Sequence, residues 1–196
     1  HDKLGYAYGR LLKDDQTAIE YYRFILLNST SELELAQARV NVALLLDADR
    51  SAQNDTALYY LQEARKVFEA NNRQSKVGIA TLNIGRFYRE AGKFDEAIEA
   101  YTKALNQVVD LSHQVQCHEY LGYIAYRQGR YDEAYHSLQT ALAVDAENGG
   151  PRNVYLNTKL GEVYTVQGRS EFSLALCDSM RRNVENAPSL SNYGRA

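Results

Sequence analysis

The chain contains no tryptophan, only two prolines and two cysteines, and no long apolar run. With two prolines and twelve glycines in 196 residues, it is neither collagen-like nor a proline-rich linker. The longest apolar runs, such as residues 42–46, fall far short of the roughly 20 residues that a membrane helix needs. A net charge of -3 creates no global attraction to nucleic acid or anionic lipid. We therefore expect no nucleic-acid partner, and no membrane span in this segment.

What is present is an ordinary globular composition. Hydrophobic residues make up 45% and charged residues 24% of the chain, which argues against disorder. Tyrosine is abundant, with 16 copies, and needs a place in the packing. The sequence opens at His1 with neither a start methionine nor a signal-peptide segment, so we expect a piece of a longer chain. The compartment stays open, with the cytoplasm favoured because no disulfide framework is visible.

Cysteine and histidine are too sparse and too scattered for a metal site. Cys117 and Cys177 both fall inside helical apolar patterns, where free cysteine usually packs as a small hydrophobe. His113 and His118 are five residues apart and point to different helix faces. No paired C-x-x-C and no H-E-x-x-H occurs. The sequence therefore predicts no metal ion and no other cofactor.

Catalytic motifs are missing as well. The acidic stretch from Asp47 to Asp55 resembles a calcium loop, but Ala52 stands where glycine is required and Leu58 where a bidentate glutamate is required. We expect a polar turn there instead. Neither a phosphate-binding glycine loop nor a G-x-S-x-G nucleophile turn occurs. We predict no catalytic residue and no enzymatic activity.

An amphipathic stripe recurs after 37 residues. The first copy consists of Phe94, Ala97, Ile98, Tyr101, Ala104 and Leu105. The second copy consists of Tyr131, Ala134, Tyr135, Leu138, Ala141 and Leu142. The steps of three and four residues predict a helix, and small residues recur where small residues stood before. The repetition predicts a modular helical array.

Each stripe is preceded in the sequence by another helical pattern, the first helix of its unit, and that helix ends at a glycine. Three pairs of glycines recur seven residues apart: Gly85 and Gly92, Gly122 and Gly129, and Gly161 and Gly168. We expect the second glycine of each pair to end a helix with a positive φ. The acids Asp95-Glu96 and Asp132-Glu133 then open the next helix, where they complement its dipole. Each unit is therefore helix, tight turn, helix.

With these motifs the chain resembles the tetratricopeptide repeat family. The third unit carries the family's pattern at Ile84, Gly85, Tyr88, Ala97, Tyr101 and Ala104, and the fourth at Leu121, Gly122, Ala125, Ala134, Leu138 and Ala141. The resemblance implies an all-α, right-handed solenoid of about ten helices in five antiparallel hairpins. The units span about residues 1–29, 30–74, 75–110, 111–150 and 151–185, and residues 186–196 form a loop or the start of a linker. Their spacings, 37 to 42 residues, exceed the standard of about 34.

Packing requirements follow from the small positions of the pattern. Small side chains allow paired helices to approach to about 8–10 Å. Gly122 and Ala134 should therefore be tightly buried where the two helices of the fourth hairpin meet. Tyr88 and Tyr101 should fill the gaps between successive hairpins, which explains part of the tyrosine excess.

The resemblance implies a concave face lined by the first helix of each unit, and that face is the predicted partner site. The family's ligand-facing positions give Asn41, Asn83, Arg86, Arg89, Tyr123, Tyr126, Arg127, Tyr155 and Lys159. Aromatic residues and arginine are enriched at binding surfaces. We expect a non-catalytic interaction module that holds a peptide or protein segment in this groove. The alternatives are that these side chains are merely solvated, or are paired with each other.

The three arginines in this set indicate what kind of ligand the groove would bind. Arg86, Arg89 and Arg127 should converge on one wall and attract an acidic or carboxylate-bearing peptide. Nearby Glu90, Glu119 and Glu162 could pair with them and make the patch structural. A second hypothesis is that the array is the sensory or regulatory arm of a larger signalling or transcriptional regulator. The sequence leaves the identity of the partner and the oligomeric state open.

Overall fold

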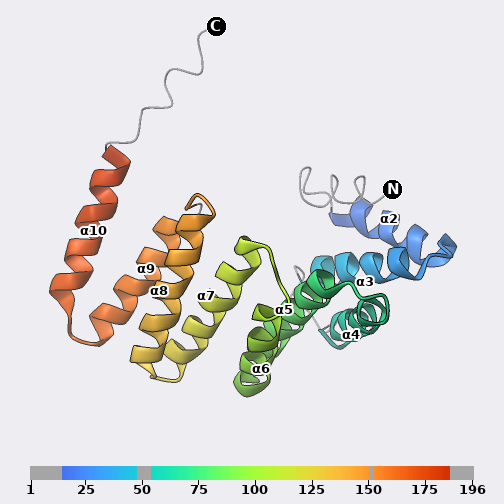
Figure 1. Ribbon diagram of the computed structural model, residues 1–196, viewed down its shortest axis with the longest axis horizontal. Helices are drawn as coiled ribbons and strands as arrows, with labels where there is room; N and C mark the ends of the chain where they lie inside the picture. The colour runs from blue at the N-terminus through green and yellow to red at the C-terminus, as the bar shows by residue number, and fades with distance from the viewer. Residues whose placement is uncertain (1–14, 48–53, 151, 186–196) are drawn as a thin grey trace, which may run out of the picture. The chain divides into compact units, whose positions relative to one another are not determined.

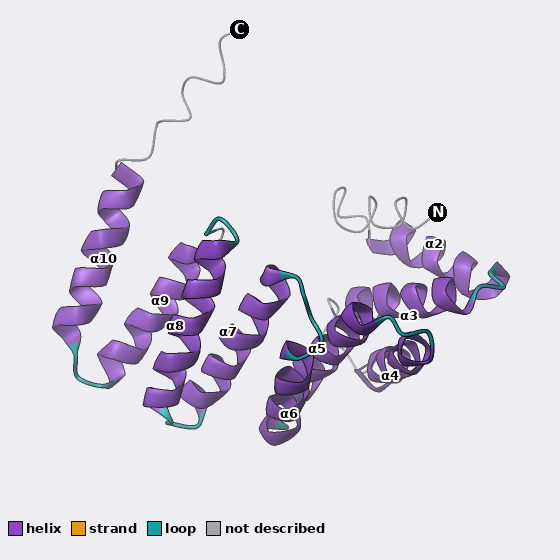
Figure 2. Cartoon of the chain, viewed as in Figure 1, coloured by secondary structure: helices purple, strands orange, loops and turns teal. Residues whose placement is uncertain are grey.

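The structure is a computed structural model, and it describes residues 15–47, 54–150 and 152–185. Over these ranges the chain is helical with short connecting loops and no strand (Figure 2). The helices are α2 (Asp15–Asn28), α3 (Glu32–Asp47), α4 (Asn54–Ala70), α5 (Gln74–Glu90), α6 (Phe94–Leu105), α7 (Leu111–Arg127), α8 (Tyr131–Glu147), α9 (Asn153–Val166) and α10 (Ser170–Glu185). The helix expected near Leu4, the acidic turn after Asp47 and the predicted C-terminal loop lie outside the described residues.

The chain divides into two compact units, residues 1–117 and 118–196. In the first unit α2 packs on α3, α3 on α4, α4 on α5 and α5 on α6 (Figure 1). In the second unit α8 packs on α9 and α9 on α10. Since the helices paired in these contacts are neighbours in the sequence, each unit is built from successive hairpins, and the all-α hairpin fold predicted from the repeats is confirmed.

Alanines and glycines let the paired helices meet closely, as the small positions of the pattern require. Ala97, Ala104, Ala134 and Ala141 are each 0% exposed. A Cβ built on Gly85 would lie 2.8 Å from Cε1 of Tyr101, whose ring is completely buried. The close α5–α6 contact confirms the third hairpin, and Tyr101 occupies the space that the missing side chain leaves.

Three hairpin turns in the described residues end their first helix with the expected glycine. Gly92, Gly129 and Gly168 have φ angles of 74°, 74° and 71°. The amide of Lys93, one residue beyond Gly92, donates to the carbonyl of Tyr88 at 2.9 Å, and the amide of Gly92 donates to Arg89 at 3.1 Å. This six-to-one and five-to-two pairing is the Schellman arrangement that satisfies the last carbonyls of a helix. The predicted positive φ is confirmed at all three turns.

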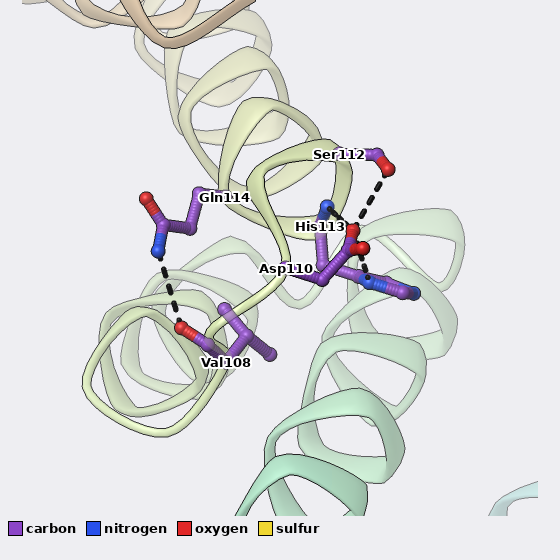
Figure 3. Close-up of polar contacts among 5 residues, drawn as sticks. All are labelled: Val108, Asp110, Ser112, His113 and Gln114. Atoms are coloured by element: carbon purple, nitrogen blue, oxygen red, sulfur yellow. Dashed lines mark hydrogen bonds and ion pairs between the residues drawn. The ribbon is translucent and has the colours of Figure 1, made fainter. Parts of the chain in front are cut away.

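The loop between α6 and α7 packs closely on α5. Val108 is 4% exposed and fills the space above Gly78, where an added Cβ would lie 2.7 Å from Cγ1 of Val108. Nε2 of Gln114 reaches back from α7 and donates to the carbonyl of Val108 at 3.2 Å (Figure 3). These contacts hold the loop against α5, and they hold the first turn of α7 against the loop.

Asp110 caps the N-terminus of α7. Its Oδ1 accepts hydrogen bonds from Oγ of Ser112 at 2.7 Å and from the backbone amide of His113 at 3.2 Å (Figure 3). Nδ1 of His113 lies 3.0 Å from the same oxygen. The hydrogen bond from Ser112 lowers the pKa of Asp110, and the bonds from His113 add to this effect although partial burial opposes it.

Candidate functional site

A groove opens on the second unit between the C-terminal part of α7, α8 and α9, and we call it the α7–α9 groove. It is lined by Glu119, Gly122, Tyr123, Tyr126, Leu138, Tyr155, Lys159, Glu162 and Val163. Its volume is about 60 Å³, whereas pockets for small molecules typically enclose about 300 to 1,000 Å³. The groove therefore has room for one side chain of a larger ligand, and not for a whole drug-sized molecule.

The floor of the groove is apolar. Leu138 of α8 and Val163 of α9 are 2% and 1% exposed. Gly122 of α7 contributes no side chain, and a Cβ built there would lie 3.0 Å from Cγ of Leu138. Gly122 and the fully buried Ala134 lie at the contact between α7 and α8, so the packing predicted for the fourth hairpin is confirmed.

Tyr155 forms one wall of the groove between two cations. Cζ of Arg152 lies 5.3 Å from the ring centroid of Tyr155, and Nζ of Lys159 lies 5.8 Å from it. Nη2 of Arg152 also donates to Oε2 of Glu119, whose side chain is 6% exposed. Burial raises the pKa of Tyr155, and the negative charge of Glu119 raises it further. The Glu119–Arg152 ion pair therefore ties α7 to the start of α9 at the edge of the groove.

The rim carries two more polar contacts. Nζ of Lys159 donates to Oε1 of Glu162 at 2.8 Å, and this hydrogen bond raises the pKa of Lys159. Nη1 of Arg127 donates to the hydroxyl of Tyr123 at 2.6 Å, while its Cζ lies 5.7 Å from the centroid of the same ring. The rim therefore presents tyrosine rings and cations above an apolar floor.

The start of α9 is held by a buried acid of α8. Asp145 is 0% exposed, and its carboxylate accepts from the backbone amide of Arg152 at 3.1 and 3.2 Å. Gly149 and Gly150, with φ of 86° and 69°, turn the chain between the two helices. This turn places Arg152 where it reaches both Glu119 and Tyr155.

Four of the predicted site residues meet in the α7–α9 groove: Tyr123, Tyr126, Tyr155 and Lys159. Arg127 is beside them, through its contact with Tyr123. The sequence pattern missed Arg152, which lies in the turn before α9 and outside the repeated positions. Glu119 was expected to compete for the predicted arginines, but its ion pair is with Arg152.

The other four predicted residues lie in the first unit. Asn41 is half-buried, and its Oδ1 accepts from Nε2 of Gln37 at 3.3 Å. Asn83 is 5% exposed, and its Nδ2 donates to the carbonyl of Ile79 at 2.9 Å. We expected its amide to face a ligand, but it is buried and bonded to its own helix.

The arginines of the first unit contact nearby residues of their own helix. Nη1 of Arg86 donates to Oδ1 of Asn83 at 3.2 Å. Nη2 of Arg89 lies 3.0 Å from Oε1 of Glu90, which is one of the competing acids named from the sequence. Arg86 and Arg89 belong to the first unit and Arg127 to the second. Their convergence on one wall therefore stays a prediction.

Neither thiol nor metal chemistry is assembled in the described part of the chain. Cys117 is completely buried in α7, and burial raises the pKa of its thiol to about 12. Cys177 of α10 is exposed. Among the residues that the structure describes, no three histidine, cysteine, aspartate or glutamate side chains are grouped to hold a metal ion.

None of the helices from α2 to α10, as described, is both long and apolar enough to cross a membrane.

Successive helical hairpins and a shallow aromatic groove define the chain as a helical repeat protein. Residues 80–115 and 115–148 match two tetratricopeptide repeat models. Residues 80–148 therefore carry tetratricopeptide repeats.

Three similar proteins illustrate the relationship. The Homo sapiens protein O-mannosyl-transferase TMTC1 is 32% identical over 93 residues, covering 47% of this chain and 10% of that protein. The chain thus spans about a tenth of the length of this relative. The TPR-like repeats of a putative kinesin light chain from Podospora anserina superpose with a TM-score of 0.70 and 17% identity, covering 95% of both chains.

The third similar structure is the Rap conjugation gene regulator of plasmid pLS20 in complex with the Phr* peptide. It gives a TM-score of 0.70 and 17% identity, and the match covers 91% of this chain and 52% of the regulator. At these identities, the two solved structures show a shared fold.

Proposed function

We propose that the chain is a non-catalytic interaction module whose α7–α9 groove binds an acidic peptide segment of a partner protein. The observation that carries the proposal is the combination of exposed tyrosines and cations at a shallow groove. Tyr123 and Tyr155 are 38% and 45% exposed, although both rings line the groove. Aromatic side chains and arginine are the types that dominate binding energy at protein interfaces.

The charges at the groove favour an acidic ligand. Three cationic side chains, Arg127, Arg152 and Lys159, contact its tyrosines. Two carboxylates, Glu119 and Glu162, line it, so the local balance is one positive charge although the whole chain carries -3. Charge complementarity of this kind guides association and selects among partners.

The fold relationship supports a peptide as the form of the ligand. The Rap regulator, which shares the fold, was solved in complex with a peptide. The α7–α9 groove is too small for a whole small molecule, whereas an extended peptide needs room for only one side chain at a time. The alternative of a regulatory arm in a larger protein stays a hypothesis, and a flanking effector domain in the full reading frame would support it.

The test is a selection of binders from a random nonapeptide display library against the 196-residue chain. We expect enrichment of peptides with aspartate or glutamate, whose affinity falls as salt rises from 50 to 300 mM. Arg127→Glu should weaken the selected peptides about tenfold, which corresponds to about 1.4 kcal/mol. Arg23→Glu, a charge reversal at an exposed position of α2, is the matched control and should leave binding unchanged. Absence of any enriched peptide, or equal effects of the two variants, would refute the proposal.

A further inference from the structure

The floor of the α7–α9 groove has a shape and a chemistry that restrict what can enter it. Gly122 lines the groove without a side chain of its own and packs against Leu138, and the buried Leu138 and Val163 form its apolar bottom. The charged side chains that line the groove are paired: Glu119 with Arg152 and Glu162 with Lys159. A polar side chain placed against Leu138 and Val163 would exchange water for apolar atoms, which is costly. The floor therefore favours an apolar side chain.

The size of the groove limits that side chain further. An apolar cavity of about 150 Å³ is known to hold benzene, whereas this groove encloses about 60 Å³. An aromatic ring is therefore too large to enter completely, while the tip of a branched or linear aliphatic chain is not. The rings of Tyr123, Tyr126 and Tyr155 would then cover the sides of an aliphatic chain.

We infer that the ligand is an acidic peptide anchored by one aliphatic side chain of leucine or methionine size, which enters the groove and packs on Leu138 and Val163. This inference rests on the proposed function and adds the identity of the anchor. The acidic residues of the peptide lie next to the anchor, since Arg127 and Arg152 contact tyrosines on the rim of the same groove. An aromatic anchor is disfavoured.

The experiment uses the peptides selected from the random nonapeptide library on the complete chain. We expect them to share one leucine, isoleucine or methionine among acidic residues. In a fluorescence anisotropy titration, changing that residue to alanine should weaken binding at least tenfold, and changing it to tryptophan should do the same. Acidic peptides with no shared aliphatic residue, or with tryptophan preferred, would overturn this inference and leave the proposed function standing. If no peptide is enriched, both fail.

Two variants of Val163 test whether the anchor occupies this groove. Val163→Ala enlarges the floor and should shift the preference from leucine toward phenylalanine, by about tenfold in the affinity ratio. Val163→Ile fills the floor and should weaken leucine peptides more than alanine peptides. Val115→Ala is the matched control, because Val115 is equally buried in α7 but does not line the groove. The urea midpoint of each variant identifies any that fails to fold. If the preference of Val163→Ala and of Val163→Ile equals that of the control, the anchor does not sit in this groove.

Discussion

Glycine-to-alanine substitutions at three equivalent positions of the array should change the free energy of unfolding in different ways: one raises it, one leaves it nearly unchanged and one lowers it. Gly85, Gly122 and Gly161 occupy the same place in successive first helices, but they face different neighbours. An added Cβ would lie 2.8 Å from Cε1 of Tyr101 at Gly85, 3.0 Å from Cγ of Leu138 at Gly122, and 3.5 Å from Oγ of Ser173 at Gly161. The first distance requires a buried ring to move, whereas the last is an ordinary contact.

The expected magnitudes follow from two opposing terms. Alanine gains about 0.8–1.0 kcal/mol over glycine inside a helix, and overpacking a buried contact costs about 1–3 kcal/mol. Gly161→Ala keeps the gain and should stabilise the protein by about 0.4–1 kcal/mol. At Gly122 the two terms nearly cancel. Gly85→Ala should lower the free energy of unfolding by about 1–2 kcal/mol, because the phenol of Tyr101 is completely buried.

Urea denaturation followed by far-UV circular dichroism measures the order of the three variants. The midpoint of Gly161→Ala should lie above that of the unmodified chain, and that of Gly85→Ala below it, with unchanged slopes. The Gly161 variant serves as the control for helix propensity, since it has the same gain without the clash. If Gly85→Ala raised the midpoint as much as Gly161→Ala, the close contact between α5 and α6 would be wrong.

Two further predictions concern a cap and a helix contact. Asp110→Ala should lower the free energy of unfolding by about 1 kcal/mol at neutral pH, because it removes the cap of α7. The pKa of Asp110 is lowered in the folded protein, so its contribution is present above the unfolded pKa of about 3.9 and is lost as the pH falls through the folded pKa. Denaturation from pH 7 to pH 2 should show the difference between variant and wild type shrinking below about pH 4; a constant difference contradicts the assignment. Ala134→Leu or Gly122→Leu should cost about 1–3 kcal/mol or more, and unchanged denaturation midpoints in both would refute the packing of the fourth hairpin.

The helices and their turns could be predicted from the sequence because each depends on local signals. A glycine seven residues after another predicted the turns at Gly92, Gly129 and Gly168, and the structure has positive φ at each. Burial of Ala97 and Ala134 followed from the helical period in the same way. Local periodicity fixes which face of a helix meets its partner.

The site was harder to predict because its contacts join different helices. Asn83 was predicted to face a ligand, but packing leaves it 5% exposed, and periodicity does not measure that burial. Arg152 reaches the groove from a turn, which follows no helical period. The close approach of Val108 to Gly78 is likewise a contact between a loop and a helix. Such contacts depend on loop conformation, for which the repeat pattern carries no signal.

The two cysteines lie in different environments, so the rates at which their thiols react can report how often α7 opens. Thiolate is the form that reacts with disulfide reagents, so the exposed Cys177 should be modified at once. Cys117 is completely buried, with a pKa of about 12, and should react only when α7 opens. The same helix carries Gly122 and Tyr123 of the groove. A ligand that binds only the closed form would slow the labelling of Cys117 by a factor of about 1 + [L]/Kd, so a thiol-exchange rate could measure peptide affinity without any attached dye.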